Sequence, residues 1–168
     1  MADMTQDLYR ACKRSAWAGS TSAKKETSFV AAHGAGSLYP DYVGFTRPDG
    51  SFRGADVTSF TDLNGVTFVV GVNETVKSRQ PYRNEGVSLN TTAGKFGYIG
   101  WFYFLLPTGT TIPGSLDVSQ TGSDANHFAL RCVIRMRKDT YEGALDAFAR
   151  AALAKSVEAA RQALYFSA

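Results

Sequence analysis

Cysteine and histidine are scarce in this chain. Its 168 residues include two of each, Cys12, Cys132, His33 and His127. Ligands so few and so widely spaced match no zinc-binding pattern, and two cysteines are too few for a disulfide framework. We therefore expect no metal site. Because both cysteines stand in apolar, strand-like settings, we expect two buried free thiols.

Long apolar runs and a leader sequence are also missing. No stretch reaches the roughly 20 apolar residues of a membrane-spanning helix. Residues 1–7 are acidic and polar, which is not typical of a secretory signal. From these absences we expect a protein that is made in the cytoplasm, has no membrane partner and leaves, if it leaves, without a cleaved signal peptide.

The charge balance is only mildly basic, at +3, with 20% charged and 44% hydrophobic residues. These values are ordinary for a globular domain. A net charge of +3 does not by itself argue for a nucleic-acid partner, which usually calls for a clustered basic surface, so such a partner is not favoured. They are compatible with an anionic small ligand or an acidic protein partner. No repeat or low-complexity linker divides the chain, so we expect residues 1–168 to form a single domain.

The common nucleotide-binding loops are missing as well. No phosphate-binding Gly-x-x-x-x-Gly-Lys loop, dinucleotide Gly-x-Gly-x-x-Gly motif or Gly-x-Ser-x-Gly nucleophile elbow is present. Gly34-Ala35-Gly36 is too short to count as one. Any site must therefore be assembled from residues that meet only in the folded chain.

The residues that are present predict a mixed α and β fold. Short strands are expected at Leu8–Cys12, Val66–Val72 and Val87–Leu89, and Arg47-Pro48-Asp49-Gly50 is a turn sequence. The unbroken apolar run Trp101–Leu106 predicts a strand buried on both faces.

A second strand pattern begins at His127 and has period two. One face would carry apolar residues and the other basic ones: Phe128, Leu130, Cys132, Ile134 and Met136 on the first, and His127, Arg131, Arg135 and Arg137 on the second. The basic face would be a plausible wall for an anionic ligand.

The C-terminal segment is the clearest helix, from Thr140 to about Phe166. Asp139 and Glu142 have the spacing of a capping box at its start. Apolar residues recur at steps of three and four, which predicts a helix with one face on the sheet: Tyr141, Leu145, Phe148, Ala152, Val157, Ala160 and Leu164.

Single residues supply the candidate chemistry. Arg10 could clamp a phosphate, Ser88 follows a glycine that allows close approach of a ligand, and His127 could exchange a proton at neutral pH. Glu85 could be a catalytic carboxylate. Each also has an ordinary explanation as a solvated or ion-paired side chain, and His33 is more typical of a surface loop.

The order of several short motifs resembles a known toxin family. Leu8-Tyr9-Arg10-Ala11, Gly86-Val87-Ser88 and His127-Phe128-Ala129-Leu130 occur in sequence, with the block Pro107-x-Gly109-Thr110-x-Ile112-Pro113-x-x-Leu116-x-Val118 before the last of them. A C-terminal segment with Tyr141, Leu145, Phe148 and Ala151 follows. Together they resemble the second exported effector of the type VI secretion system, a bacterial toxin family with an ADP-ribosyltransferase-like fold.

The resemblance implies an α+β single domain with a split, mainly antiparallel β core, surrounding helices and a long C-terminal helix. It implies that NAD is the substrate and that no metal takes part. It also implies a toxin that is exported by a component of the secretion apparatus, acts in the cytoplasm of a target cell and is neutralised by a cognate immunity protein.

The same resemblance assigns roles to residues. Tyr9, Arg10, Gly86, Val87 and Ser88 would bind NAD, with Arg10 on its phosphate or ribose. Catalytic roles would fall to Ser88, His127 and Glu85. Val87 stands where the family motif has threonine, and Glu85 is only adjacent to the motif. The acceptor of ADP-ribose could be a protein, a nucleic acid or water.

Two other functions stay open at this point. One is a toxin that cleaves nucleic acid with His127 and the face carrying Arg131, Arg135 and Arg137. The other is a non-catalytic inhibitor on the same scaffold. The NAD hypothesis depends on a spatial expectation, namely that Arg10, Ser88 and His127 converge on one hollow.

Overall fold

A computed structural model describes residues 2–13, 36–75 and 82–166. His33, which the sequence placed in a surface loop, lies outside the described residues. No helix among the described residues combines the length and apolarity that a membrane crossing requires.

A five-stranded antiparallel sheet forms the centre of the fold. Its strand order is β7-β1-β6-β9-β8. The bounds are β1 Leu8–Lys13, β6 Val87–Asn90, β7 Trp101–Leu106, β8 Leu116–Gln120 and β9 His127–Cys132. The strands expected at the N-terminus, around Val87 and after His127 are confirmed.

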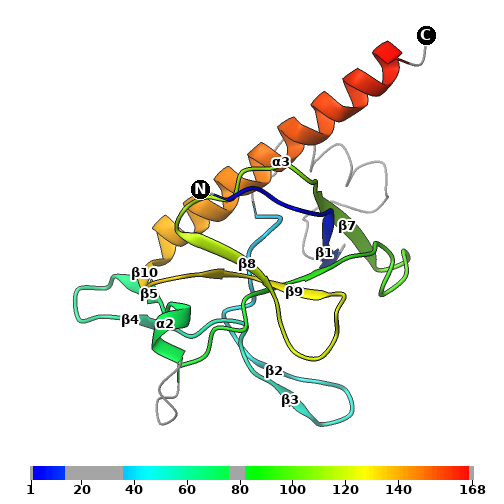
Figure 1. The fold of residues 1–168 in the computed structure, drawn as a ribbon. Helices are drawn as coiled ribbons and strands as arrows, with labels where there is room; N and C mark the ends of the chain where they lie inside the picture. The colour runs from blue at the N-terminus through cyan, green and yellow to red at the C-terminus, as the bar shows by residue number, and fades with distance from the viewer. Residues whose placement is uncertain (1, 14–35, 76–81, 167–168) are drawn as a thin grey trace.

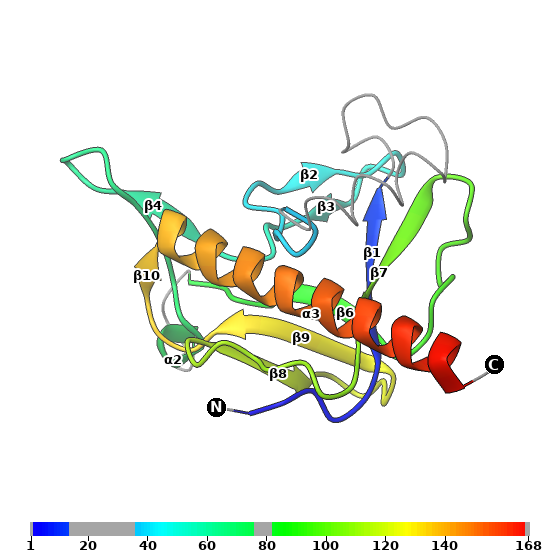
Figure 2. The ribbon, with the colours of Figure 1, turned by 90° about the horizontal axis from the view of Figure 1, so that it is seen from above.

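The sheet is split between β1 and β6. Strand β1 pairs with β7 along its whole length, from Leu8↔Leu106 to Lys13↔Trp101, but it pairs with β6 only at Tyr9↔Asn90. Figure 2 shows β1 and β7 rising away from the direction of β8 and β9. The split, mainly antiparallel core that the resemblance implied is therefore confirmed, and the split leaves room for a cavity.

Two smaller sheets flank the first. A three-stranded sheet has the order β10-β5-β4, with β4 Ser59–Thr61, β5 Thr67–Val69 and β10 Met136–Arg137. A hairpin joins β2 Phe45–Thr46 to β3 Phe52–Arg53 through the expected turn, where Gly50 has φ of 87°. The strand expected over Val66–Val72 is shorter. It ends at Val69, and a four-residue helix, α2 Val72–Thr75, begins after Val70 and Gly71.

Helix α3, Lys138–Phe166, packs across the sheet with its first half only. Tyr141, Leu145 and Phe148 are fully buried, whereas Val157 is 56% exposed. In Figure 1 the later turns extend beyond the strands toward the C-terminus. The predicted amphipathic face is thus confirmed for the first half of the helix and does not extend to its end.

The start of α3 differs from the expected capping box. Asp139 lies inside the helix, where its carboxylate accepts hydrogen bonds from the Thr140 amide and the Arg137 guanidinium. Glu142 accepts a hydrogen bond from the Tyr42 hydroxyl at 3.2 Å. Glu142 therefore ties the helix to the segment before β2.

Both cysteines are free and buried, as expected. Burial raises the pKa of each thiol to about 11. At neutral pH both side chains are therefore neutral members of the core.

Strand β7 departs from the sequence-based expectation. It was expected to be buried on both faces, but it is an edge strand of its sheet. Phe104 and Leu106 are buried in the core, while Trp101 and Tyr103 are half-buried and line a cavity. One face of the apolar run therefore packs in the core, and the other face lines the cavity.

Candidate functional site: a basic cavity in the split sheet

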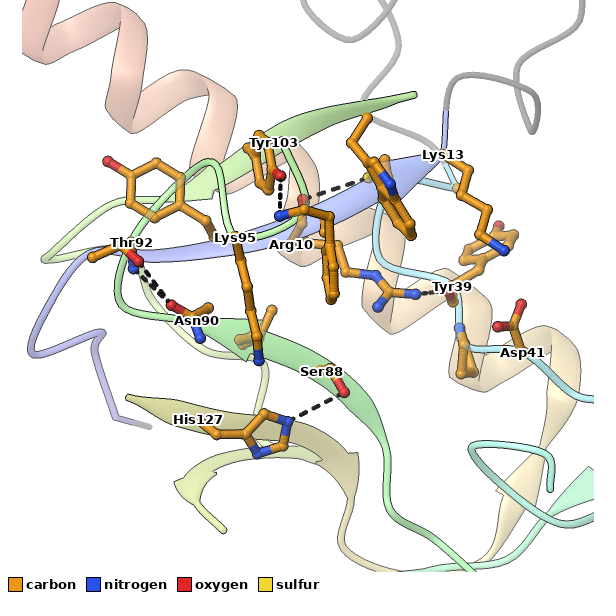
Figure 3. Close-up of a pocket in the computed structure, with 18 of the residues that line it drawn as sticks. Arg10, Lys13, Tyr39, Asp41, Ser88, Asn90, Thr92, Lys95, Tyr103 and His127 are labelled. Atoms are coloured by element: carbon orange, nitrogen blue, oxygen red, sulfur yellow. Dashed lines mark hydrogen bonds between the residues drawn. The ribbon is translucent and has the colours of Figure 1, made fainter. Parts of the chain in front are cut away.

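A cavity of about 610 Å³ occupies the split between β1 and β6. This volume is within the range of small-molecule sites. Figure 3 shows side chains from distant parts of the chain pointing into it. The lining includes Tyr9, Arg10, Cys12, Lys13, Tyr39, Asp41, Phe45, Arg53, Ser88, Asn90, Thr92, Lys95, Phe96, Trp101, Tyr103 and His127.

Arg10, Ser88 and His127 all line this cavity. Their convergence, on which the NAD hypothesis depended, is therefore confirmed. Strand alternation explains the position of Ser88, because its neighbour Val87 is fully buried in the core while Ser88 and Asn90 share the cavity side. The replacement of the motif's threonine by Val87 consequently falls on the core side of β6.

His127 is held between two hydroxyl groups. Its Nε2 lies 3.3 Å from Ser88 Oγ on the neighbouring strand, and its Nδ1 lies 2.8 Å from Thr121 Oγ1. Two partners fix the plane of the imidazole ring and direct Nε2 at the serine. The pair Ser88 and His127 can therefore orient a polar group of a ligand or pass a proton between them.

Arg10 is positioned by a chain of contacts that leads to helix α3. Its Nη2 donates a hydrogen bond of 3.2 Å to the Tyr39 carbonyl. The carboxylate of Asp146 on α3 accepts one bond from the Tyr39 hydroxyl at 2.7 Å and one from the Gly36 amide at 2.9 Å. The bond to Tyr39 leaves other donors of the guanidinium fork for an anionic ligand.

Positive charge dominates the described lining of the cavity. Four basic side chains contribute to it, namely Arg10, Lys13, Arg53 and Lys95, against one carboxylate among the described lining residues, that of Asp41. Arg53 is also paired with Asp56 at 3.1 Å. In the view of Figure 3, Lys13 and Lys95 reach into the cavity from opposite sides of Arg10. A cavity with this balance attracts anions.

Three sequence-predicted site residues do not line the cavity. Glu85 is exposed and forms an ion pair of 2.7 Å with Arg83. Gly86 adopts φ of 76° and packs so closely on β9 that a Cβ would collide with the Leu130 carbonyl. Val87 is part of the core. Gly86 and Val87 are placed to hold β6 against β9 and thereby to position Ser88.

The expected basic face of β9 does not form. The strand ends at Cys132, because residues 133–135 turn the chain toward the three-stranded sheet. Arg135 pairs with Glu74 at 2.6 Å and lies over the Phe60 ring, and Arg137 pairs with Asp139. Only Arg131 shares β9 with His127, and it contacts Ser119 on β8.

Several lining residues were not predicted as site residues. Asn90 shares a face of β6 with Ser88, so strand alternation could have identified it. Lys13 and Trp101 form a cross-strand pair on β1 and β7, but alternation on β1 does not select Lys13, because the consecutive residues Tyr9–Lys13 all line the cavity. Tyr39, Asp41 and Lys95 lie in loops. Loops carry no period that reports which way a side chain points.

The sequence as a whole matches the family model of the Tse2 ADP-ribosyltransferase toxin over residues 6–157. The chain belongs to this family. The resemblance found in the short motifs is thereby confirmed, and with it the α+β ADP-ribosyltransferase-like fold. The match supports a bacterial toxin with ADP-ribosyltransferase-like activity, for which NAD is the substrate. A search among curated proteins finds no match.

Metal-binding residues do not gather anywhere in the described part of the chain. No group of three or more histidine, cysteine, aspartate or glutamate side chains is placed to hold an ion there. The polar side chains of the described lining are instead cationic groups, hydroxyls, an amide, one imidazole and the single carboxylate of Asp41. These groups suit a phosphate-bearing organic ligand.

Proposed function

We propose that NAD binds in the cavity between β1 and β6 and that this toxin cleaves its nicotinamide–ribose bond. The observation that carries the proposal is the meeting of Arg10, Ser88 and His127 in one positively lined cavity. Arg10 holds the pyrophosphate or the adjoining ribose. Ser88 and His127 orient the nicotinamide end.

The chemistry requires little covalent participation by the protein. The bond between ribose C1′ and the nicotinamide nitrogen breaks with its electron pair moving to the nitrogen, which leaves neutral nicotinamide and an oxocarbenium-like ribose. An acceptor oxygen or nitrogen then bonds to C1′ and loses a proton. The cavity lowers the barrier by fixing the cofactor in the reactive geometry.

The nature of the acceptor divides two activities. A protein or nucleic-acid acceptor makes the toxin a transferase, whereas water makes it an NAD glycohydrolase. Both release nicotinamide, so nicotinamide release is the test of the shared step.

The other two functions have less support. The nuclease hypothesis needs Arg135 and Arg137 on the same strand face as His127. Both arginines lie beyond the end of β9 and pair with carboxylates. A non-catalytic inhibitor would give no reason for an oriented Ser88–His127 pair inside a cavity.

Family membership supports a proposal for the biological setting. We propose that a component of the type VI secretion apparatus delivers the toxin without a cleaved signal peptide, and that it acts in the cytoplasm of the recipient cell. A cognate immunity protein neutralises it. The basic cavity favours an acidic partner surface placed over its mouth.

The decisive experiment is induction in bacteria, with growth and cellular NAD measured together. Wild type is expected to stop growth and deplete NAD. Arg10→Ala, Ser88→Ala and His127→Ala are each expected to relieve both effects. Arg150→Ala, an exposed substitution on α3 outside the described cavity lining, serves as the matched control for charge removal and is expected to remain toxic.

Three results would separate the alternatives. Toxicity with cellular NAD unchanged, and RNA or DNA degraded, would support the nuclease. Toxicity unaffected by all three substitutions would support the non-catalytic inhibitor. Normal growth with the wild-type protein at full expression would remove all three functions.

A further inference from the structure

The cavity has two chemically different ends. At one end the strands β6 and β9 present Ser88, Asn90 and His127, which are polar and compact. The other end presents aromatic rings and an ammonium group. We call it the aromatic end and define it as Lys13, Phe45, Phe96 and Trp101.

The rings of the aromatic end are already arranged as a platform. Phe96 stacks on Trp101 with ring centroids 4.8 Å apart and an interplanar angle of 29°. The loop that carries Phe96 is fastened by Tyr103, whose hydroxyl donates to the Gly97 carbonyl at 2.7 Å and accepts from the Phe96 amide at 2.9 Å. The stacked pair is therefore anchored to the edge strand β7.

The Lys13 side chain brings a positive charge close to two of these rings. The ammonium of Lys13 is 5.5 Å from the centroid of Phe45 and 5.7 Å from that of Trp101. Phe45 and Phe96 remain 40% and 54% exposed. Partly exposed aromatic rings next to a cation suit a ligand that joins a flat ring to a phosphate, because the base can stack and the phosphate can pair.

The two ends are separated along β1. Tyr9 marks the closed end of the split, in register with Asn90, which in turn is in register with His127. Lys13 lies four residues further along β1, or about 13 Å, and pairs with Trp101. One base cannot contact both ends, whereas a dinucleotide has two ring systems joined by a charged linker. In the view of Figure 3, Arg10 lies between Lys13 and the pair formed by Ser88 and His127.

We propose that the adenine of NAD stacks on the aromatic end, with Lys13 beside its phosphate, while the nicotinamide occupies the end formed by Ser88, Asn90 and His127. The assignment rests on the proposed function, since it takes NAD as the ligand. It adds the direction in which the dinucleotide lies and the residues that select its adenylate half.

The test uses the two halves of the dinucleotide separately. AMP and nicotinamide mononucleotide are titrated into the purified protein by calorimetry. Phe96→Leu and Trp101→Leu are expected to weaken AMP and NAD binding by on the order of tenfold and to leave nicotinamide mononucleotide unchanged. Phe52→Leu, an exposed aromatic residue outside the described lining, is the matched control and is expected to bind all three ligands as wild type does.

A spectroscopic signal tests the contact itself. The sequence has two tryptophans, so Trp17→Phe leaves Trp101 as the single one. AMP is expected to change the tryptophan fluorescence of the Trp17→Phe variant. Nicotinamide mononucleotide is expected to leave it unchanged. Phe96→Leu keeps the test usable if Trp101→Leu does not fold.

Two failures are distinguishable. If NAD does not bind the wild-type protein and no nicotinamide is released, the proposed function itself falls. The orientation alone is overturned if NAD binds and is cleaved but AMP binds Phe96→Leu and Trp101→Leu as tightly as it binds wild type. The same holds if the affinity for AMP falls in Ser88→Ala and not in these two variants.

Discussion

The hydroxyl of Tyr39 donates a 2.7 Å hydrogen bond to Asp146 on helix α3, while the carbonyl of the same residue accepts a bond from Arg10. One residue thus connects the helix on the outside of the fold with the arginine inside the cavity. The carboxylate and desolvation raise the pKa of Tyr39 well above its ordinary value, desolvation being the larger cause, so its hydroxyl stays protonated and donating.

Removal of that hydroxyl should disturb the binding of NAD more than its turnover. Tyr39→Phe keeps the ring and the carbonyl but loses the anchor to Asp146, so the segment that holds Arg10 loosens. We expect KM for NAD to rise severalfold, with a smaller change in kcat. Steady-state nicotinamide release measures both.

Tyr42→Phe is the matched control for Tyr39→Phe. Tyr42 donates to Glu142 one turn earlier on the same helix and lies outside the described cavity lining. A similar loss of stability in the two variants, with KM raised only by Tyr39→Phe, would locate the effect at Arg10. Equal KM changes in both would contradict this positioning role.

Ser88 and His127 should act as a unit. Their side chains are in contact at 3.3 Å, so removing either one disrupts the same arrangement. We expect Ser88→Ala and His127→Ala each to lower the rate of nicotinamide release on the order of 10²-fold, and the double variant to lose little more. Additive losses in the double-mutant cycle would show that the two residues act independently.

Glu85→Gln should leave nicotinamide release nearly unchanged. The side chain is exposed, outside the described cavity lining, and engaged with Arg83 on the surface, where an ion pair contributes about 1 kcal/mol or less. The rate of nicotinamide release by Glu85→Gln is compared with that of His127→Ala at the same protein concentration. A collapse of activity in Glu85→Gln would mean that this carboxylate reaches the reacting atoms in the NAD complex.

Alkaline pH should destabilise the fold partly through Cys132. Burial raises its pKa to about 11 in the folded state, above its value in the unfolded chain. Its contribution to stability is therefore fully present below the unfolded pKa and is lost as the pH rises through the folded value. We expect the fall in Tm between about pH 8 and pH 10.5 to be smaller in Cys132→Ala than in wild type. Equal falls would assign the alkaline loss to other groups.

Helix α3 should tolerate change in its second half and not in its first. Leu145 is fully buried, and Leu145→Ala should lower the free energy of unfolding by about 2–5 kcal/mol. Val157 is 56% exposed, and Val157→Ala should change it by about 0.5 kcal/mol or less. Urea unfolding followed by circular dichroism measures both, and a large loss in Val157→Ala would indicate that the second half is covered in solution.

Local sequence patterns were enough to predict several elements of the fold. The apolar steps from Tyr141 to Ala152, the strand around Ser88 and the turn at Pro48 each depend on neighbouring residues, so periodicity and turn chemistry were enough to predict them. The resemblance carried by the short motifs added the split core and the three residues that converge.

Tertiary structure decided what each strand faces. The apolar run predicted Trp101 and Tyr103 as core residues. In the structure they line the cavity, because β7 lies at the edge of the sheet. The period of two predicted Arg135 on the same strand face as His127. In the structure Arg135 pairs with Glu74, because the chain turns after Cys132. A side-chain period of two fixes which residues share a face, but only the pairing of distant strands decides whether that face meets core, cavity or solvent.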